Sequence, residues 1–289
     1  DRVGARPQYI ARSDTQQASP TETTEFSQMS SPRSILISGA SSGIGEALAR
    51  HYAGETATLF LSGRDADRLG AVSRACEALG STVDGQAIDV ADQAAMHPLI
   101  SLADTQAALD LVVANAGISG GTSGGIESAA QTQQIFEVNV KGVLNTVLPA
   151  LERMTDRGHG QIAIVSSLAG FLPLPGAPAY SASKASIRHF GEALRISAAR
   201  RGVGVSVICP GFVHSRMTAT NPFSMPFIMP AEKAARIIAA GLARNRARIA
   251  FPWPMYWSVR ILGSLIPLGL CQTVLGRLPE KPSTGGTGT

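Results

Sequence analysis

The hydrophobic pattern from residue 34 onward alternates short apolar runs with longer amphipathic ones. The short runs lack strict alternation of apolar and polar positions, as expected for strands that helices cover on both faces. The predicted strands are 34–38, 57–62, 82–88, 110–116, 160–167, 204–210 and 247–251, and the predicted helices are 43–53, 65–79, 91–103, 128–155, 178–200 and 231–243. Strand–helix alternation of this kind predicts an α/β fold with a doubly wound parallel sheet of about seven strands.

The sequence predicts a single domain over about residues 32–252, with a different composition on either side. Residues 1–31 are rich in Ser, Thr, Gln and Pro and show no apolar periodicity, so we expect them to be disordered. They also contain no apolar stretch of the kind found in a secretory signal peptide. Residues 279–289 are rich in Gly and Thr and are expected to form a flexible tail.

Residues 253–278 are expected to form an apolar helical extension, and their only charged residues are Arg260 and Arg277. The uncharged run 261–276 is shorter than the roughly 18 residues that a transmembrane helix needs. Aromatic residues precede Arg260, an arrangement typical of a membrane–water interface. Three interpretations stay open: a helix on a membrane surface, a subunit interface, and a flap over a substrate pocket.

Charge and cysteine content exclude several classes of protein. The net charge of +4 is too mild for nucleic-acid binding to be expected. The three cysteines, Cys76, Cys209 and Cys271, are far apart and form no Cys-x-x-Cys motif, so we expect neither disulfides nor a metal site. This usage suits a reducing cytoplasm, and we expect a cytoplasmic protein, peripheral to the inner face of a membrane if the extension lies on a bilayer.

A glycine-rich segment, SGASSGIG at 38–45, joins the first predicted strand to the first predicted helix. Glycine permits a tight turn and a close approach of the backbone to a ligand. The helix that follows offers unpaired N–H groups and a positive dipole end, which suit a pyrophosphate. We therefore expect nucleotide contacts from Gly39, Ser41, Ser42, Gly43, Ile44 and Gly45.

Tyr180 and Lys184 stand four residues apart in YSASK and would share one face of a helix. An ammonium group beside a phenol stabilises the phenolate, so we expect the pKa of Tyr180 to fall toward neutrality. Such a tyrosine could donate or accept a proton. On this stretch alone, an accidental pair on an exposed helix is the simpler interpretation.

Together these motifs resemble the classical short-chain dehydrogenase/reductase family. The resemblance runs from about residue 34 to 251, and its motifs occur in the family's order. They are SGASSGIG, DV (89–90), ANAG (114–117), the Asn of FEVNVKG (136–142), SS (166–167), YSASK (180–184) and PG (210–211). It implies a Rossmann-type sheet and reversible hydride transfer between a nicotinamide and a carbonyl or alcohol carbon; we also expect a homo-oligomer, a dimer or tetramer.

The resemblance implies a catalytic set of Asn139, Ser167, Tyr180 and Lys184. Tyr180 would exchange a proton with the substrate oxygen, which Ser167 would also hydrogen-bond. Lys184 would lower the pKa of Tyr180 and hold the nicotinamide ribose. Asn139 would hold a water that links the lysine to solvent. Ser166 is the lesser alternative to Ser167, because the family's serine lies thirteen residues before its tyrosine.

The resemblance also implies cofactor contacts beyond the glycine-rich segment. Asp89 and Val90 would contact the adenine, and three residues after the fourth strand would line the adenosine ribose: Asn115, Ala116 and Gly117. The nicotinamide would be bordered by Pro210, Gly211, Val213 and Ser215, with Tyr180 and Lys184 at its ribose. The chain departs from the family at Ser38, where Thr is common, and at Ala114, where an Asn is common.

NADP(H) is favoured over NAD(H). Family members that use NAD carry Asp at the end of the second strand, where this chain has Gly63 followed by Arg64. The planar guanidinium of Arg64 suits a 2′-phosphate. The alternative is that Arg64 pairs with Asp65 or Asp67 on the surface, which would weaken the preference.

The substrate-facing loops would be 118–125, 168–178 and 212–230, and the last is rich in Phe and Met. As a lid it would offer an adaptable apolar surface to a small hydrophobic carbonyl or alcohol, although simple packing explains it equally well. The expected function is that of an NADP(H)-dependent oxidoreductase. The alternatives are an NAD-dependent dehydrogenase of the same fold, or a non-catalytic nucleotide-binding or membrane-associated scaffold.

Overall fold

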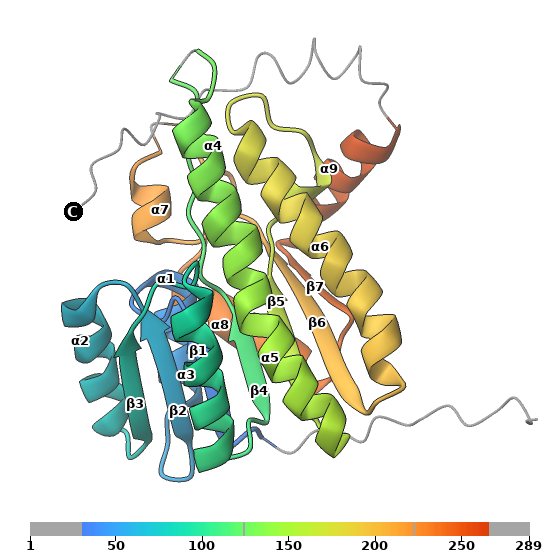
Figure 1. Cartoon of the computed structure of the whole chain (residues 1–289). Helices are drawn as coiled ribbons and strands as arrows, with labels where there is room; N and C mark the ends of the chain where they lie inside the picture. Colours follow the sequence, from blue (N-terminus) through green and yellow to red (C-terminus); the bar gives the residue numbers. More distant parts are fainter. Residues whose placement is uncertain (1–30, 124, 222, 266–289) are drawn as a thin grey trace, which may run out of the picture.

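Seven parallel strands form one sheet in the order β3-β2-β1-β4-β5-β6-β7 (Figure 1). The computed structural model describes residues 31–123, 125–221 and 223–265. The strands are β1 Ser34–Ser38, β2 Thr58–Gly63, β3 Thr82–Ala87, β4 Leu111–Ala114, β5 Gly160–Val165, β6 Val203–Pro210 and β7 Arg248–Phe251. The predicted Rossmann-type fold is therefore confirmed.

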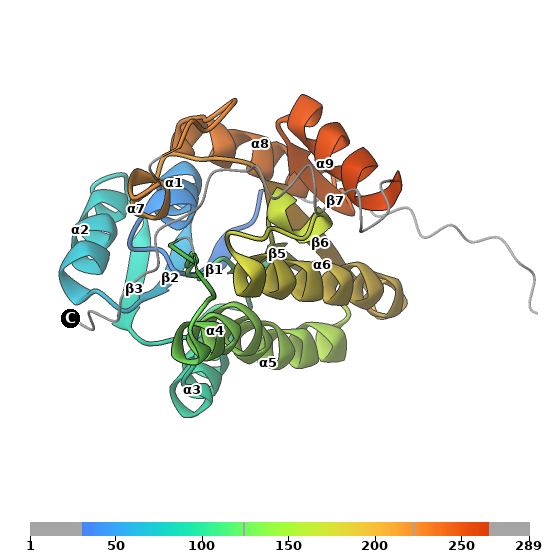
Figure 2. The same ribbon diagram turned by 90° about the horizontal axis from the view of Figure 1, so that it is seen from above.

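Helices cover both faces of the sheet (Figure 2). One face carries α1 Gly43–Tyr52, α2 Ala66–Glu77 and α8 Ala231–Ala243. The other carries α3 Gln93–Gln106, α4 Ala129–Phe136, α5 Gly142–Arg157 and α6 Pro178–Ala199. A 3-10 turn (η2, Leu168–Phe171), a short helix (α7, Arg216–Ala219) and α9 (Trp253–Leu265) lie above the carboxyl ends of the strands or beside them (Figure 1).

Each strand of the sheet's centre sends its side chains alternately into two apolar cores. Ile35 and Ile37 of β1 pack into the core under α1, α2 and α8, whereas Leu36 packs into the core under α3, α5 and α6. All residues of β1, β5 and β6 are buried. Burial on both faces explains why these strands read as continuous apolar runs.

The topological switch lies between β1 and β4, which pair in parallel, with Ile37 opposite Val113. The chain leaves β1 for α1 on one face and leaves β4 for α4 and α5 on the other. The two connections therefore part at the carboxyl ends of these strands. Crevices at such points bind ligands in open α/β sheets.

The predicted single helix 128–155 is interrupted. A π-helical turn, η1 (Glu137–Lys141), separates α4 from α5. The other predicted helices and strands are present, with ends that differ by a few residues. The sequence pattern did not separate η2 or α7 as elements of their own, whereas α9 begins at Trp253, where the apolar helical extension was expected to begin.

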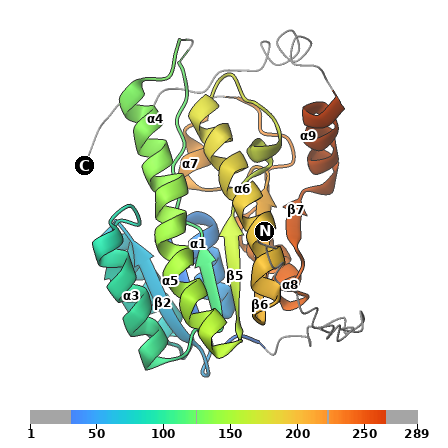
Figure 3. The same ribbon diagram turned by 45° about the vertical axis from the view of Figure 1, so that its right-hand side comes forward.

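Helix α9 packs against η2 and the end of the sheet beside α6 (Figure 3). Its inner residues Met255, Tyr256 and Val259 join Leu168 and Phe171 in a small apolar cluster. Among the described residues, no helix combines the length and the apolar character that a membrane crossing requires. The predicted disorder of residues 1–30 and flexibility of 279–289 lie outside the described residues, as does the remainder of the extension from residue 266.

Candidate active site

The glycine-rich turn after β1 brings its backbone against the end of β4. Gly39 has φ of +68°, and a Cβ there would lie 2.7 Å from Ala116 Cα. A Cβ on Gly45 would lie 2.2 Å from the carbonyl oxygen of Gly39. Both distances are shorter than any real contact, so only glycine fits at these two positions.

The N-terminus of α1 is open at this turn. Ser42 is the N-cap residue, has an extended backbone and forms no capping hydrogen bond through its side chain. The first N–H groups of a helix have no intrahelical acceptor, so they are available to a phosphate. A Cβ on Gly43 would lie 3.2 Å from Cβ of Ser215, which places the loop after β6 across the same opening. The cradle therefore fits a dinucleotide pyrophosphate.

Asn115 locks the turn to β4. Its amide Nδ2 donates to the carbonyl oxygens of Ser38, at 3.0 Å, and Gly39, at 3.1 Å. The Ser38 hydroxyl in turn accepts from Asn115 N at 3.2 Å. Asn115 thus holds the cradle in shape, a structural task beyond the ribose contact expected of it.

Asp89 and Val90 lie after β3. Asp89 Oδ1 accepts from the Ala91 N–H at 2.9 Å, which fixes the bend of this loop. Val90 is buried under α5, where a Cβ on Gly142 would lie 2.6 Å from Val90 Cγ2. A contact between Val90 and an adenine would therefore have to use the backbone of Val90.

At the end of β2, Arg64 is exposed and forms no ion pair or hydrogen bond with any residue that the structure describes. Asp65 instead caps α2 by accepting from Arg68 N at 3.0 Å and pairs with the Arg68 guanidinium at 2.8 Å. Gly63 faces the glycine-rich turn, since a Cβ there would lie 3.2 Å from Ser41 Oγ. The expected alternative of an Arg64–Asp65 pair is absent from the described residues.

Tyr180 and Lys184 lie one turn apart on α6. Lys184 is only 3% exposed, and its Nζ lies 5.9 Å from the centroid of the Tyr180 ring. Nζ donates to the carbonyl oxygen of Val165 at 3.0 Å. Burial lowers the pKa of Lys184 to about 8, so both of its protonation states are accessible near neutral pH.

The expectation that the pKa of Tyr180 falls is wrong for the protein chain itself. Burial raises the pKa of Tyr180 above its ordinary value, and a hydrogen bond with Ser167 offsets only part of that rise. The Lys184 ammonium donates to the Val165 carbonyl oxygen, and among the described residues no hydrogen bond joins it to the phenol of Tyr180. Tyr180 is therefore protonated at neutral pH.

The two serines at the end of β5 have different environments. Ser166 is buried, and its hydroxyl donates to the Lys184 carbonyl oxygen at 2.7 Å, which ties β5 to α6. Ser167 caps η2 by accepting from Ala169 N at 3.1 Å and donates to the Pro210 carbonyl oxygen at 3.4 Å, and it is the serine whose hydroxyl acts on the pKa of Tyr180. The geometry thus brings Ser167, rather than Ser166, to the phenol.

Asn139 lies in the π-helical turn and is fully buried. Its Oδ1 accepts from Ile118 N at 2.8 Å, while Nδ2 donates to Ile118 O at 2.9 Å and to Ser183 Oγ at 3.0 Å. A Cβ on Gly117 would lie 3.2 Å from both Asn139 Oδ1 and Lys184 Nζ. Gly117 therefore leaves room for both side chains. Single π-helical turns inside α-helices often occur at functional sites.

Two residues of this region escaped the sequence analysis. Ser183 connects Asn139 to α6, because its hydroxyl also donates to Tyr180 O at 2.8 Å. Glu127 caps α6 from the loop after β4, since its Oε2 accepts from Ala179 N at 2.9 Å. Ser183 lies inside the YSASK motif and could have been noticed, whereas nothing local links Glu127 to Ala179.

The loop after β6 closes the remaining side. Gly211 N donates to the Phe251 carbonyl oxygen at 2.7 Å, which holds Pro210 and Gly211 at the sheet edge. Val213 is buried and bridges to Met229, and Ser215 caps α7 by accepting from Thr218 N at 3.3 Å. The predicted nicotinamide-side residues thus share one loop that faces the glycine-rich turn.

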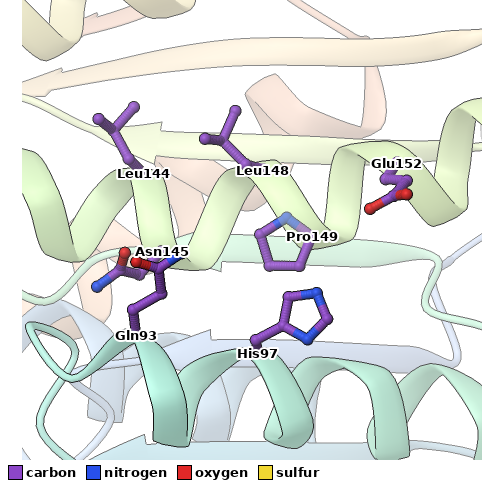
Figure 4. Close-up of a pocket in the computed structure, with 7 residues that line it drawn as sticks. All are labelled: Gln93, His97, Leu144, Asn145, Leu148, Pro149 and Glu152. Atoms are coloured by element: carbon purple, nitrogen blue, oxygen red, sulfur yellow. The ribbon is translucent and has the colours of Figure 1, made fainter.

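A groove of about 150 Å³ lies between α3 and α5, lined by Gln93, His97, Leu148, Pro149 and Glu152 among others (Figure 4). All of these residues belong to α3 or α5, and none of them lies in the loops at the carboxyl ends of the strands. It contains none of the expected catalytic or cofactor residues, so we do not assign the active site to it.

The family model for short chain dehydrogenases matches residues 33–223. The chain belongs to this family. Short-chain dehydrogenases are NAD(P)-dependent oxidoreductases, and the chain is one of them. It is 39% identical over 247 residues to a relative described as an uncharacterised oxidoreductase from Myxococcus xanthus, covering 85% of this chain and 97% of the relative.

Solved short-chain dehydrogenase structures share the fold. One from Mycobacterium paratuberculosis bound to NAD has a TM-score of 0.67 at 23% identity and covers 75% of this chain and 94% of its own. Another from Sphingobium yanoikuyae in complex with NADPH has a TM-score of 0.70 at 24% identity and covers 86% of this chain and 96% of its own. Since the two carry different cofactors, they leave the choice between NAD and NADP to the residues of this short-chain dehydrogenase.

Proposed function

We propose that the protein is an NADP(H)-dependent reductase that converts the carbonyl group of an apolar substrate to an alcohol, reversibly, with Tyr180 as general acid and base. The observation that carries the proposal is the meeting of Ser167, Tyr180, Lys184 and Asn139 beside the glycine-rich turn. These residues come from three separate elements. Structural packing alone does not call for a buried lysine next to a tyrosine and a serine at this point.

A nicotinamide cofactor held by the glycine-rich turn and by Lys184 would supply the hydride for the carbonyl carbon. Tyr180 donates its phenolic proton to the carbonyl oxygen as the C=O π bond becomes a C–O–H group, and Ser167 donates a hydrogen bond to the same oxygen. The raised pKa of Tyr180 keeps this proton in place at neutral pH. In its ammonium form, Lys184 stabilises the phenolate that remains.

We assign Asn139 to the return of the proton from solvent. Its Oδ1 accepts one hydrogen bond, from Ile118 N, and an amide oxygen can accept a second. Asn139 Oδ1 and Lys184 Nζ border the same glycine, since a Cβ on Gly117 would lie 3.2 Å from each of them. A water held there would connect Lys184 to the outside and reprotonate Tyr180 through it.

The preference for NADP(H) rests on Arg64. Its guanidinium has no partner among the described residues and stands after Gly63, where a carboxylate would otherwise hold the ribose hydroxyls. We expect NADPH to bind more tightly than NADH, and Arg64→Ala to remove about 1.5–3 kcal/mol of that difference, a factor of roughly 10 to 150. Calorimetric titration of both cofactors into wild type and variant measures it.

Arg74 provides the matched control, because it is an exposed arginine farther along α2. Arg74→Ala should leave both dissociation constants unchanged. Equal affinities of the wild type for NADPH and NADH would refute the assignment and leave Arg64 as an ordinary surface residue.

An apolar substrate is supported by the surfaces around the site. Leu172 and Leu174 of the loop after β5 cluster with Leu262 of α9. In the loop after β6, Phe227 is exposed, while Phe212 and Phe223 contact each other at 6.1 Å between ring centroids. Cofactor oxidation with cyclohexanone, decanal and a steroid ketone, against acetone as a polar reference, tests both the reaction and the substrate class.

A second role, attachment to an anionic membrane surface, is favoured by the outer face of α9. Trp253, Trp257 and Ile261 recur every four residues and are 72%, 51% and 51% exposed. Arg260 is exposed on the same helix, and α9 contains no acidic residue. Tryptophan beside arginine is the chemistry of helices that lie in the headgroup region of anionic lipids.

Trp253→Ala/Trp257→Ala should lower the partition constant for phosphatidylglycerol vesicles by about 100-fold or more, since each of the two apolar side chains contributes about 1.5 kcal/mol or more when buried. Leu79→Ala, at an exposed leucine of the loop after α2, is the control and should have no effect. Absence of vesicle binding by the wild type would refute this role. If the double variant also lowers the mass of an oligomer, the outer face of α9 is a subunit interface.

A further inference from the structure

A cluster of charged and aromatic side chains lies directly behind the turn that carries Ser167. Phe171, the last residue of η2, lies under two guanidinium groups: the Cζ atoms of Arg188 and Arg248 are 4.5 Å and 5.4 Å from its ring centroid. Arg188 Nε also donates to the Gly170 carbonyl oxygen at 3.3 Å. Two cation–π contacts on one ring are uncommon, since significant ones occur about once per 70–80 residues.

Glu192 joins the two arginines. Its Oε2 accepts from Arg188 Nη1 at 2.9 Å, and its Oε1 accepts from Arg248 Nε at 2.8 Å. The three side chains are mostly buried, so their charges are less screened than those of surface pairs. Without the carboxylate, two like charges would remain beside the same aromatic ring.

The same cluster holds α9. Arg248 Nη1 donates to the Tyr256 hydroxyl at 3.0 Å, and the Tyr256 ring meets Phe171 edge to face at 5.5 Å between centroids. Farther along α9, a Cβ on Gly263 would lie 2.0 Å from the Phe171 carbonyl oxygen. The helix backbone therefore rests against η2 at a point where only glycine fits.

On its other side, η2 rests on the catalytic helix. A Cβ on Gly170 would lie 2.8 Å from the carbonyl oxygen of Lys184. Arg188 stands one helical turn beyond Lys184, and Ser167 immediately precedes η2. Phe171 is thus the point where the turn of Ser167, the helix of Tyr180 and Lys184, and α9 are fastened to one another.

We infer that Arg188, Glu192 and Arg248 are positioning residues for the reaction: by holding Phe171 they set Ser167 against Tyr180 and fasten α9 as an apolar wall of the substrate site. The inference rests on the proposed function for its catalytic part. Glu192 is the central member, because it alone separates the two positive charges. The wall they fix includes Leu172, Leu174 and Leu262, which would contact the alkyl part of the substrate.

Glu192→Gln tests the inference, because it removes the charge and keeps the side-chain volume. We expect kcat for decanal to fall by about 10- to 100-fold, as small misplacements of reacting groups do, while the dissociation constant for NADPH stays within about twofold. Phe171→Leu should have a similar effect, whereas Phe171→Tyr should retain most activity because it keeps the aromatic ring.

The chain offers a matched control and a second readout. Asp104 pairs with Arg157 at 2.5 Å and with Arg153 at 3.7 Å, joining α3 to α5 away from the site, so Asp104→Asn should lower the melting temperature without changing kcat. The protein's two tryptophans both lie on α9, so their emission and acrylamide quenching report its attachment. Glu192→Gln should change this signal, and Asp104→Asn should not.

A lower melting temperature of Glu192→Gln, with kcat and tryptophan quenching unchanged, would overturn the inference. The ion pairs of Glu192 would then have a purely structural role. If the wild type reduces none of the carbonyl probes, the proposed function fails separately. The tryptophan signal then decides the fastening of α9: a change in Glu192→Gln supports it, and no change refutes it.

Discussion

Tyr180→Phe is expected to lower kcat for carbonyl reduction by about 10²- to 10⁴-fold, the range that a general acid contributes. The substitution removes the phenolic proton, which the proposed mechanism delivers to the substrate oxygen, and the interaction of the phenol with Ser167. The aromatic ring remains, so packing beside Lys184 should persist. Steady-state kinetics with decanal and NADPH, together with a calorimetric dissociation constant for NADPH, measure both parts of the expectation.

Tyr52→Phe is the control for this substitution, because Tyr52 ends α1 on the far side of the glycine-rich turn and packs into the core there. It should leave kcat unchanged. If Tyr180→Phe keeps activity within about tenfold of the wild type, a smaller loss than general acid catalysis implies, Tyr180 is not the proton donor.

Gly45→Ala is expected to weaken NADPH binding by at least about 100-fold and to destabilise the fold by about 1–3 kcal/mol, the usual cost of overpacking. The added methyl group would lie 2.2 Å from Gly39 O and 2.6 Å from Asn115 Nδ2. Relief of that clash has to move the turn away from β4 and open the cradle for the pyrophosphate. Isothermal titration and urea unfolding report the two effects.

Gly54→Ala is the matched glycine, because no atom lies within 4 Å of the Cβ that it would acquire. It should change neither NADPH affinity nor stability appreciably. Gly43→Ala provides an intermediate case: its φ is +58°, but the nearest atom to its Cβ is 3.2 Å away. Should Gly45→Ala bind NADPH as the wild type does, the glycine-rich turn is not the cofactor site.

The sheet could be predicted from the sequence because its determinants are local. Each apolar run is flanked by an amphipathic one, and only a parallel sheet buries both faces of strands such as β5 and β6. The parallel order also brings Ser167 and Tyr180 together, although thirteen residues separate them. The order of the strands thus determines the positions of most of the predicted site residues.

What the sequence could not supply depends on burial and on long-range contacts. The pKa of Tyr180 was predicted in the wrong direction, because the neighbouring lysine is visible in the sequence whereas desolvation is not. The cap that Glu127 gives to α6 spans 52 residues. Arg188 and Glu192 form a readable i, i+4 pair, but Arg248 joins them only through the packing of β7.

The π-helical turn at Asn139 has a consequence for the phase of the helix in which it lies. One extra residue in a turn rotates everything after it by about 100° relative to an uninterrupted α-helix. The core-facing positions absorb this rotation in a single step of five residues, between Val138 and Val143, while the other steps are three or four. These positions are Ile135, Val138, Val143, Val147, Ala150 and Met154. This rotation therefore lets both α4 and α5 keep their apolar sides toward the core. At the π-helical turn between them, Asn139 is directed toward Ile118 and Ser183.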